Sequence, residues 1–267
     1  MNFRIVIPTH NAADYLDLCL YSLKKHAFWE HEYHVILDDC QDNTQDICEK
    51  YKVYYYSVNF HHPYKTRNSI KEFINLSEDF YLFMTADDMF ASPNWDRKIL
   101  AHHEREKDVV WSSQLTDYLL FESYEDAKKE NVNLQIEDFT SWWASKGIHM
   151  DFRECGTNIN NFNKEIFLAK FDIISEEGQY YNSERDGIRD VLCNTNFLIK
   201  SFFWKELSGW PLLEKEPIDA RLGNNDVLFQ HKVVELGGRN IVPKDVLFFH
   251  FGGRTINREL NNVGVNL

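Results

Sequence analysis

Several features that would place this chain in other classes of protein are missing from its sequence. There is no run of about 18 apolar residues, so the sequence predicts no transmembrane helix. A strand is expected almost at the N-terminus, which leaves no room for a signal peptide. The five cysteines are odd in number, scattered and without a C-x-x-C pair. This pattern favours a reduced, cytoplasmic protein without structural zinc.

Other absences narrow the function. The formal net charge of −13 lacks the basic footprint of a general nucleic-acid binder, so nucleic acid is not an expected partner. No Ser/His/Asp order, P-loop or G-x-G-x-x-G pattern supports a hydrolase or a Rossmann dehydrogenase. No repeat, low-complexity tract or Pro/Gly/Ser-rich linker divides the chain. We therefore expect one continuous domain over residues 1–267, with a hydrophobic content of 43% that supplies a substantial core.

The N-terminal half alternates short apolar runs with stretches of helical periodicity. The expected strands are 3–7, 33–37, 53–58, 80–85 and 109–111, and the expected helices are 12–25, 44–51, 65–76 and 94–104. Pro8 is expected to stop the first strand. Such alternation predicts a parallel sheet with right-handed crossovers, an α/β fold.

The second half is less regular. Residues 115–194 carry no clear pattern, and order is expected again in a strand at 196–200, with a short helix up to Leu207. A helix at 226–235 and strands at 241–242 and 246–249 follow. The residues expected on the apolar face of the 226–235 helix are Val227, Leu228, Val233, Val234 and Leu236.

The chain is organised around residues 80–89, where a continuous apolar run ends in Asp87 and Asp88. Such a run is typical of a strand buried on both faces, and its carboxyl end is where α/β sheets bind ligands. Two adjacent carboxylates there suit a hard divalent cation, Mn²⁺ or Mg²⁺, that holds a diphosphate. The alternative is a helix N-terminus, where Asp is favoured at the cap and in the first turn.

A second acidic pair, Asp38 and Asp39, follows the strand expected at 33–37. Since carboxyl ends of parallel strands share one edge of a sheet, we expect both acidic pairs to converge there. Lys65 and Arg67 open the intervening helix and add positive charge. A pocket with both signs of charge suits a nucleoside diphosphate held by a metal and by cations.

Six groups of short motifs occur in the order typical of one enzyme family. They are Ile5-Val6-Ile7-Pro8-Thr9-His10-Asn11 with Leu20-Tyr21-Ser22-Leu23; Ile36-Leu37-Asp38-Asp39 with Asp42-Asn43-Thr44; Lys65-Thr66-Arg67-Asn68; Thr85-Ala86-Asp87-Asp88 with Pro93; 196–200 with Gly209-Trp210; and Asn225-Asp226 with Lys232. Together they resemble the family 2 glycosyltransferases. This resemblance implies the GT-A fold, a Rossmann-like, mostly parallel sheet flanked by helices, and inverting transfer of a sugar from a nucleotide-sugar donor.

The resemblance also implies roles for individual residues. The donor-binding residues would be Pro8, Thr9, Asn11, Asp38, Asp39, Arg67 and Asp87. Asp39 would accept a hydrogen bond from the base, typically uracil, and Arg67 would contact the base or the diphosphate. Asp88 would bind the cation, and Asp226 would be the general base that deprotonates the acceptor hydroxyl.

Later residues are assigned with alternatives. His250 is a candidate metal ligand, as a late histidine is in some related transferases, or a strand-end histidine with a structural role. Arg254 is a candidate lid residue. Trp142, Trp143 and above all Trp210 are candidates for stacking on an acceptor sugar, or for the core.

The chain also departs from the family pattern. Thr85 stands where the acidic motif usually begins with Asp, and Asn225 and Lys232 replace a Glu and an Arg. These departures keep a second hypothesis open, that of a non-catalytic nucleotide-sugar-binding or scaffold protein. A nucleotidyltransferase would need a Gly-rich loop near the N-terminus, which is absent.

The expected division of labour places donor binding in residues 1–112, and acceptor binding and the catalytic base in residues 113–267. The family's commonest acceptor is a polysaccharide or a lipid-linked oligosaccharide. Without a membrane segment, the protein is expected to reach such an acceptor as a cytoplasmic enzyme, free or recruited to a membrane by partners. The sequence does not predict the oligomeric state.

Overall fold

The computed structural model describes residues 1–116, 188–189, 196–212, 224–243 and 245–250. In the first segment the elements are β1 (Phe3–Thr9), α1 (Ala13–His26), β2 (Glu32–Asp38), α2 (Thr44–Tyr51), β3 (Tyr54–Val58), α3 (Pro63–Asn68), α4 (Ile70–Phe73), β4 (Tyr81–Met84), β5 (Met89–Ala91), α5 (Trp95–Ala101), β6 (Asp108–Trp111) and β7 (Ser113–Thr116). The later elements are β8 (Ile188–Arg189), β9 (Phe197–Lys200), α9 (Ser201–Leu207), α10 (Asn224–Glu235), β10 (Arg239–Ile241) and β11 (Leu247–His250).

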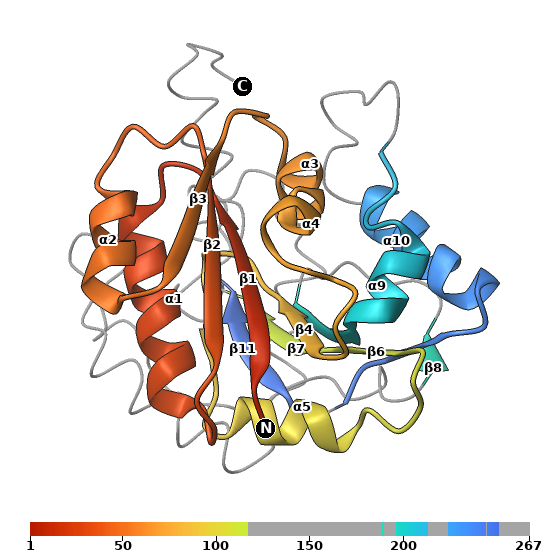
Figure 1. Cartoon of the computed structure of the whole chain (residues 1–267). Coiled ribbons are helices and arrows are strands. Elements are labelled where there is room, and N and C mark those ends of the chain that lie inside the picture. The colour runs from red at the N-terminus through yellow and green to blue at the C-terminus, as the bar shows by residue number, and fades with distance from the viewer. Residues whose placement is uncertain (117–187, 190–195, 213–223, 244, 251–267) are drawn as a thin grey trace, which may run out of the picture.

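The described strands form two sheets (Figure 1). The large sheet has the order β3-β2-β1-β4-β9-β6-β10-β8, and the small sheet has the order β5-β11-β7. Strands β1 to β4 pair in parallel, whereas β9 is antiparallel to both of its neighbours, β4 and β6. The prediction of a mostly parallel α/β sheet is therefore confirmed, with β9 as a reversed strand in its middle.

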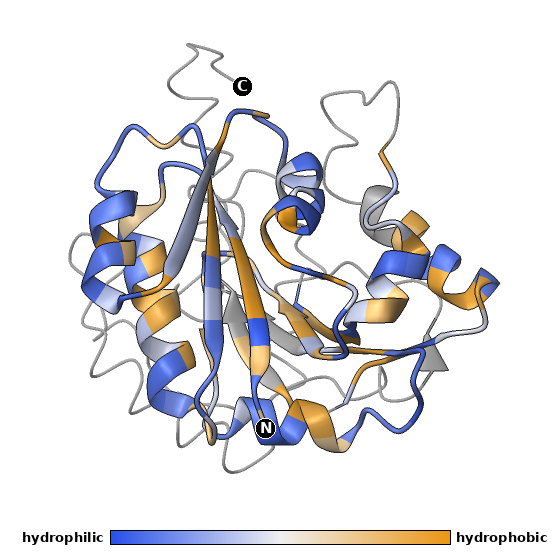
Figure 2. Cartoon of the chain, viewed as in Figure 1, coloured by the Kyte–Doolittle hydropathy of each residue, from blue (hydrophilic) through white to orange (hydrophobic). Residues whose placement is uncertain are grey.

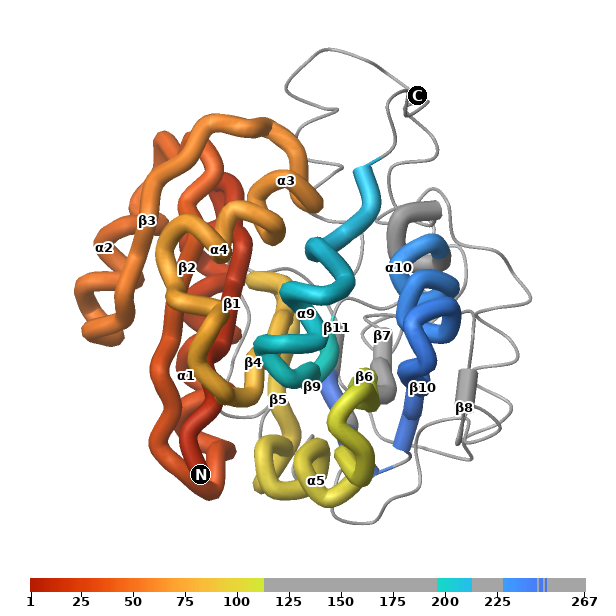
Figure 3. Tube along the Cα trace, turned by 45° about the vertical axis from the view of Figure 1, so that its right-hand side comes forward, coloured from red at the N-terminus to blue at the C-terminus, as the bar shows by residue number. Residues whose placement is uncertain are grey.

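Helices cover both faces of the large sheet. α1 and α2 lie on one side, and α3, α4, α9 and α10 lie on the other (Figures 1 and 3). Side chains alternate along β1, so Ile5 and Ile7 join the core under α1 while Val6 joins the core on the opposite face. Figure 2 shows β1 as largely hydrophobic and α2 as largely hydrophilic on its outer surface. The apolar runs in the sequence thus reflect strands buried on both faces.

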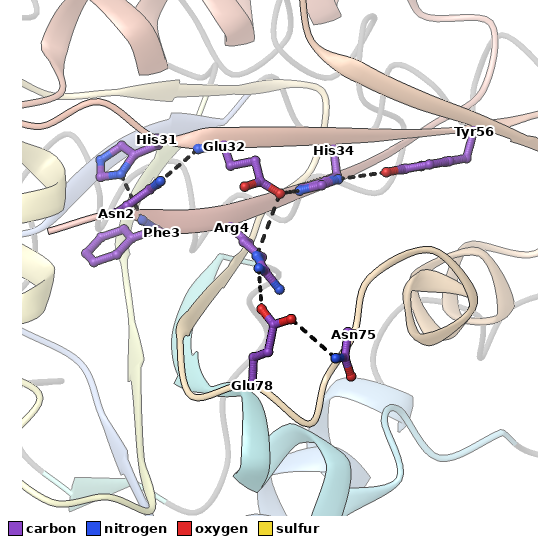
Figure 4. Close-up of polar contacts among 9 residues, drawn as sticks. All are labelled: Asn2, Phe3, Arg4, His31, Glu32, His34, Tyr56, Asn75 and Glu78. Carbon is purple, nitrogen blue, oxygen red and sulfur yellow. Dashed lines mark hydrogen bonds and ion pairs between the residues drawn. The ribbon is translucent and has the colours of Figure 1, made fainter.

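A chain of polar contacts ties the first three strands together (Figure 4). Arg4 on β1 contacts Glu32 on β2 at 3.6 Å and donates to Glu78, ahead of β4, at 2.7 Å. Glu32 also contacts His34 at 2.6 Å, and His34 Nδ1 lies 3.1 Å from the Tyr56 hydroxyl on β3. These contacts complement the parallel pairing with a specific side-chain register.

Two of the boundaries that differ from those expected have a clear physical cause. β1 continues through Pro8 to Thr9, because β4 pairs with β1 only as far as Val6. Thr85 donates its backbone N–H to the Val6 carbonyl. Pro8 lies two residues further along β1, so its nitrogen, which carries no hydrogen, faces the same side at a point beyond the end of β4. No hydrogen bond between strands is therefore lost at Pro8. The helix expected at 65–76 is instead two short helices, broken at Ser69, whose hydroxyl donates to the Thr66 carbonyl.

The expected apolar face of α10 is also wrong in part. Leu228 and Val234 are 38% and 44% exposed, whereas Phe229 and Val233 are fully buried. Phe229 and Val233 are one helical turn apart, so they define the face that packs on the sheet. Among the helices that the structure describes, none has the length and apolar character needed to cross a bilayer.

Candidate active site

Asp87 and Asp88 lie in the short connection between β4 and β5. Both residues are 7% exposed. β5 begins directly at Met89 and pairs with β11, so the chain continues as a strand and not as a helix. This excludes the alternative in which the two aspartates cap a helix N-terminus.

The electrostatics of this pair are unusual for carboxylates. Burial and then repulsion from Asp88 raise the pKa of Asp87 to about 7, although the Thr9 hydroxyl and the Arg67 guanidinium act in the opposite direction. A carboxyl group with a pKa this high is poorly compensated by the surrounding protein. The connection after β4 is therefore a place where an additional positive charge is favourable.

Arg67 and Thr9 complete this group of side chains from two other elements. Thr9 is the last residue of β1, and Arg67 lies in α3, after β3. Arg67 is only 6% exposed, and its guanidinium carbon lies 5.4 Å from the centre of the Tyr64 ring. Its buried Nε has no hydrogen-bond partner among the described residues. The structure thus brings together Thr9, Arg67, Asp87 and Asp88. Arg67 was expected beside the acidic pair from its place in the chain, whereas Thr9 was implied by the family resemblance.

Asp38 has a different environment from Asp87. Its carboxylate accepts hydrogen bonds from the backbone N–H groups of residues 60, 61 and 62 at 2.7, 3.1 and 3.1 Å and from the Thr66 hydroxyl at 2.6 Å. Burial alone would raise the pKa of Asp38, but these hydrogen bonds outweigh it and the pKa is lowered. Asp38 therefore shapes the loop between β3 and α3 and so positions the helix that carries Arg67.

Asp39 and Asn11 both lie just beyond a strand in the left-handed backbone region, with φ of 51° and 48°. The Asp39 carboxylate accepts from the Gln41 side chain at 2.9 Å and lies 3.3 Å from His61 Nε2. Its side chain remains 33% exposed, so it is accessible to a ligand. The Asn11 side-chain oxygen accepts from the Gln41 backbone N–H at 2.7 Å, which joins the loops after β1 and β2.

The structure also accounts for Thr85, the departure from the usual acidic motif. Its side chain is fully buried and its hydroxyl donates to the Asn196 side-chain oxygen at 2.9 Å. The same oxygen accepts from the Ala86 backbone N–H at 3.3 Å. Asn196 directly precedes β9, so this pair joins the loop that carries the two aspartates to the reversed strand. Asn196 was part of a sequence motif, but its link to this loop was not predicted.

The structure contradicts the prediction that Trp210 stacks on an acceptor sugar. Trp210 is 2% exposed and lies 4.3 Å, between ring centres, from Phe229 on α10. It also lies 5.7 Å from Phe197 and 5.4 Å from Tyr64. A ring enclosed in this way has no free face for a sugar, so Trp210 is a core residue beside the site.

With this geometry in place, comparison with known proteins identifies the family. The sequence matches the description "Glycosyl transferase family 2" over residues 4–177, more than half of the chain. The chain belongs to this family. One relative is the poly(ribitol-phosphate) beta-N-acetylglucosaminyltransferase TarS of Staphylococcus aureus (strain Mu50 / ATCC 700699). It is 36% identical over 97 residues, which cover 33% of this chain and 16% of TarS.

Solved structures give the fold of this family 2 chain. The S. aureus TarS crystal structure matches with a TM-score of 0.55 and 18% identity, covering 98% of this chain and 39% of TarS. The mannosyltransferase PcManGT from Pyrobaculum calidifontis, in complex with GDP-Man and Mn²⁺, matches with a TM-score of 0.55 and 12% identity, covering 94% and 57%. GalNAc-T7, with UDP, GalNAc and Mn²⁺, matches with a TM-score of 0.57 and 10% identity, covering 94% and 44%. The fold is GT-A, and the chain spans less than half the length of TarS.

For the remaining residues predicted for this family 2 site, the structure describes the backbone alone or does not describe the residue. Asp226 is the third residue of α10, and its side chain lies outside the described part. His250 is the last residue of β11 and pairs through its backbone with Met89, the residue after Asp88. Its side chain is likewise not described, and Trp142, Trp143 and Arg254 lie outside the described residues.

The two carboxylates that follow β4, those of Asp87 and Asp88, are suitable ligands for a divalent cation. Carboxylate oxygens are the ligands that Mg²⁺ and Mn²⁺ prefer, and the raised pKa of Asp87 makes an additional positive charge favourable there. Among the residues with described side chains, no three His, Cys, Asp or Glu groups lie close enough to form a complete metal site. Further ligands would have to come from the substrate, from water or from residues outside that set.

Proposed function

We propose that this family 2 chain transfers a sugar from a nucleotide-sugar donor, a UDP-sugar, to a hydroxyl group of an acceptor, with inversion. The observation that carries this proposal is the buried pair Asp87 and Asp88 beside Arg67. A site with two buried, adjacent carboxylates, of which Asp87 has a raised pKa, and one buried guanidinium suits a diphosphate that arrives with a cation. The negative charge of the two aspartates suits the metal ion and the positive charge of Arg67 suits the diphosphate, whereas a neutral ligand would need neither.

The donor nucleoside is assigned to the ends of β1 and β2. Pro8 and Thr9 border it, and the exposed carboxylate of Asp39 accepts a hydrogen bond from the base. Asp38 and Asn11 contribute indirectly, since Asp38 supports the loop before α3 and Asn11 joins the two strand ends. UDP in the GalNAc-T7 complex and GDP-Man in the PcManGT complex support a nucleotide-sugar donor.

Asp88 would hold the divalent cation, and His250 is the candidate second protein ligand because its backbone lies opposite Met89. When bound, Mn²⁺ or Mg²⁺ would offset the charge of the leaving diphosphate. The Mn²⁺ in the PcManGT and GalNAc-T7 complexes supports this assignment. Asp87 contacts the ribose or the donor sugar, and Arg67 donates hydrogen bonds to the diphosphate.

The chemical step is assigned to Asp226. Its carboxylate accepts the proton of the acceptor hydroxyl, whose oxygen forms a bond to the anomeric carbon. The bond from that carbon to the diphosphate oxygen breaks on the opposite face, and the diphosphate leaves with the electron pair. Attack from the opposite face inverts the anomeric centre. Asn225 next to it is neutral, so no second carboxylate at that position raises the pKa of the base.

The acceptor is a saccharide or a lipid-linked saccharide, bound by residues 113–267. The relative TarS is a poly(ribitol-phosphate) beta-N-acetylglucosaminyltransferase, which supports a polymeric acceptor. Donor binding is correspondingly assigned to residues 1–112, which carry Thr9, Arg67 and Asp88.

The donor site is tested by calorimetric titration of UDP, GDP, TDP and CDP, each with and without Mn²⁺. We expect Mn²⁺-dependent binding of UDP to the wild type and its loss in Asp88→Ala. Asp79→Ala is the matched control, because Asp79 precedes the same strand at its other end and its side chain is 74% exposed. If no nucleotide binds the wild type under any condition, the proposed donor site is wrong.

Catalysis is tested separately with Asp226→Asn. We expect this variant to bind the nucleotide with Mn²⁺ as the wild type does and to lose sugar transfer. Full transfer by Asp226→Asn would remove Asp226 as the base. A wild type that binds UDP but turns over no UDP-sugar, even by hydrolysis, would favour the non-catalytic binding protein.

A further inference from the structure

Arg67 packs beside two aromatic rings that come from distant parts of the chain and contact each other, with ring centres 5.4 Å apart. Its guanidinium carbon lies 5.4 Å from the Tyr64 ring centre and 5.8 Å from the Trp210 ring centre. Tyr64 belongs to the same helix, α3, whereas Trp210 follows α9. Since a guanidinium stacks favourably on aromatic faces, the two rings restrict where Arg67 can point.

The connection between α3 and Trp210 is a pair of reciprocal hydrogen bonds. The Asn68 side-chain nitrogen donates to the Trp210 carbonyl at 2.9 Å, and the Trp210 backbone N–H donates to the Asn68 side-chain oxygen at 2.8 Å. The two residues are 142 positions apart. An amide that satisfies both the donor and the acceptor of one peptide backbone fixes position and orientation together. We call this pair the Asn68–Trp210 clamp.

The turn on the other side of the clamp is built to approach Asn68 closely. Ser208 and Gly209 have φ of 58° and 77°, in the left-handed region that follows many helices. A Cβ on Gly209 would lie 2.3 Å from the Asn68 side-chain oxygen. Any side chain at 209 would therefore push Asn68 away from Trp210.

The clamp also reaches the proposed catalytic helix. The Trp210 ring lies 4.3 Å from the Phe229 ring, and Phe229 is one helical turn after Asp226 on α10. Trp210 thus contacts Arg67 on one side and α10 on the other. Its own indole N–H is buried and has no hydrogen-bond partner among the described residues, so the backbone bonds to Asn68 are what hold it.

We propose that Asn68, Gly209 and Trp210 are positioning residues for donor binding. The Asn68–Trp210 clamp orients the Arg67 guanidinium toward Asp87. Through the contact between Trp210 and Phe229, it also fixes the position of α10 relative to Arg67. The inference rests on the proposed donor site, and it assigns Trp210 a role in place of the acceptor contact predicted from the sequence. Arg67 is then presented to the diphosphate without having to be ordered on binding.

The test is the variant Asn68→Ala, with Asn240→Ala as its matched control. Asn240 is also buried and also bridges two distant segments with two hydrogen bonds, from Trp111 at 3.0 Å and to the Gln230 carbonyl at 3.1 Å. It lies on β10, three strands from β4 in the large sheet. Both variants should lose stability, but only Asn68→Ala should bind UDP with Mn²⁺ roughly tenfold more weakly, the equivalent of about 1.4 kcal/mol. Equal UDP affinity in Asn68→Ala and wild type, or equal weakening in both variants, would overturn the clamp.

A second readout does not depend on nucleotide binding. The buried Arg67 Nε–H, which packs beside two rings, should give a slowly exchanging, ring-shifted NMR signal that is assigned by its absence in Arg67→Lys. In Asn68→Ala we expect the chemical shift of this signal to move toward the value of a solvent-exposed arginine Nε–H. In Asn240→Ala we expect the chemical shift to stay unchanged. If the wild type binds no nucleotide, the proposed function fails, and this signal alone decides whether the clamp holds Arg67. An unmoved signal in Asn68→Ala overturns the clamp in either case.

Discussion

Asp38 and Asp87 each begin an acidic pair after a buried strand, yet the folded chain treats them in opposite ways. Asp38 accepts four hydrogen bonds from the protein, and its pKa is lowered. Asp87 faces a second buried carboxylate, and its pKa is raised to about 7. One aspartate is compensated by the fold and stabilises it. The other is left for a ligand and costs stability when it is ionised without one.

The difference shows that the type of residue at a strand end does not decide its role. Backbone N–H groups of a later loop surround Asp38, while Thr9, Arg67 and the Asp87 backbone N–H offset only part of the burial of Asp87 and of the repulsion from Asp88. One carboxylate thus builds the loop before α3, and the other is the one that we propose for a charged substrate.

The sharpest test of this comparison is Asp88→Asn, for which we expect the largest effect. Sugar transfer should fall by about 10³-fold, the order of magnitude lost when a preorganised electrostatic group is removed from a site. The free energy of unfolding without metal should be unchanged or higher, because the like-charge repulsion is relieved. Initial rates at saturating Mn²⁺ and urea unfolding measure the two quantities. A variant that is active but unstable would reverse the assignment of the two pairs.

Asp38→Ala should show the opposite behaviour. It leaves three backbone N–H groups without their acceptor, while the Thr66 hydroxyl can still donate to the His62 carbonyl at 2.9 Å. The free energy of unfolding should therefore fall by about 3 kcal/mol. Because the pKa of Asp38 is lowered in the folded state, its contribution is present above the usual value of 3.8 and is lost as the pH falls through the folded-state pKa. The gap between wild type and variant should therefore narrow in acid.

The matched control for Asp38→Ala is Asp39→Asn. Asn tolerates the left-handed backbone of this position, and the Asp39 side chain is 33% exposed. Urea unfolding of this variant should agree with the wild type to within about 0.5 kcal/mol. A loss as large as that of Asp38→Ala would mean that both members of the first pair are structural.

Thr85→Val should have the smallest effect of the series. It removes the hydrogen bond to Asn196 while the same oxygen still accepts from the Ala86 N–H. We expect the free energy of unfolding to fall by about 1 kcal/mol and sugar transfer to stay close to that of the wild type. A large loss of transfer without loss of stability would show that the Thr85 hydroxyl itself contacts the donor.

Much of the fold was predictable because its signals are local. The apolar runs at β1, β2 and β4 and the periodicity of α1 predicted a parallel α/β sheet. The strand ends predicted an acidic edge near Arg67, and the family resemblance implied Thr9. The reversed strand β9 was not predicted as such, because its pairing with β4 joins residues more than a hundred positions apart in the sequence. No local pattern specifies such a pairing.

The site was predictable in its residues but not in their division of labour. Asp38 and Asp39 look alike in the sequence, and only the fold of residues 60–66 around Asp38 separates them. Trp210 is of a residue type that often stacks on sugars, but its burial against Phe229 makes it a core residue. Asn68 and Asn196 are uncharged, so no charge pattern in the sequence marked them as important to the site. Their roles depend on partners that the tertiary structure brings close.

The account is tested most directly by the unfolding free energies of wild type and Asp87→Asn, measured in EDTA from pH 5 to pH 8. The pKa of Asp87 is about 7 in the folded protein and 3.8 in the reference state, so folding takes up a proton between these values and wild-type stability falls as the pH rises through them. The variant has no carboxyl group to titrate at this position, so it should be more stable than the wild type at pH 8 by on the order of 4 kcal/mol, because the pKa difference of about three units corresponds to about 1.4 kcal/mol per unit. The difference should shrink toward pH 5. A difference that does not change with pH, or a variant less stable than the wild type at pH 8, would contradict the claim that this carboxylate is left uncompensated by the fold.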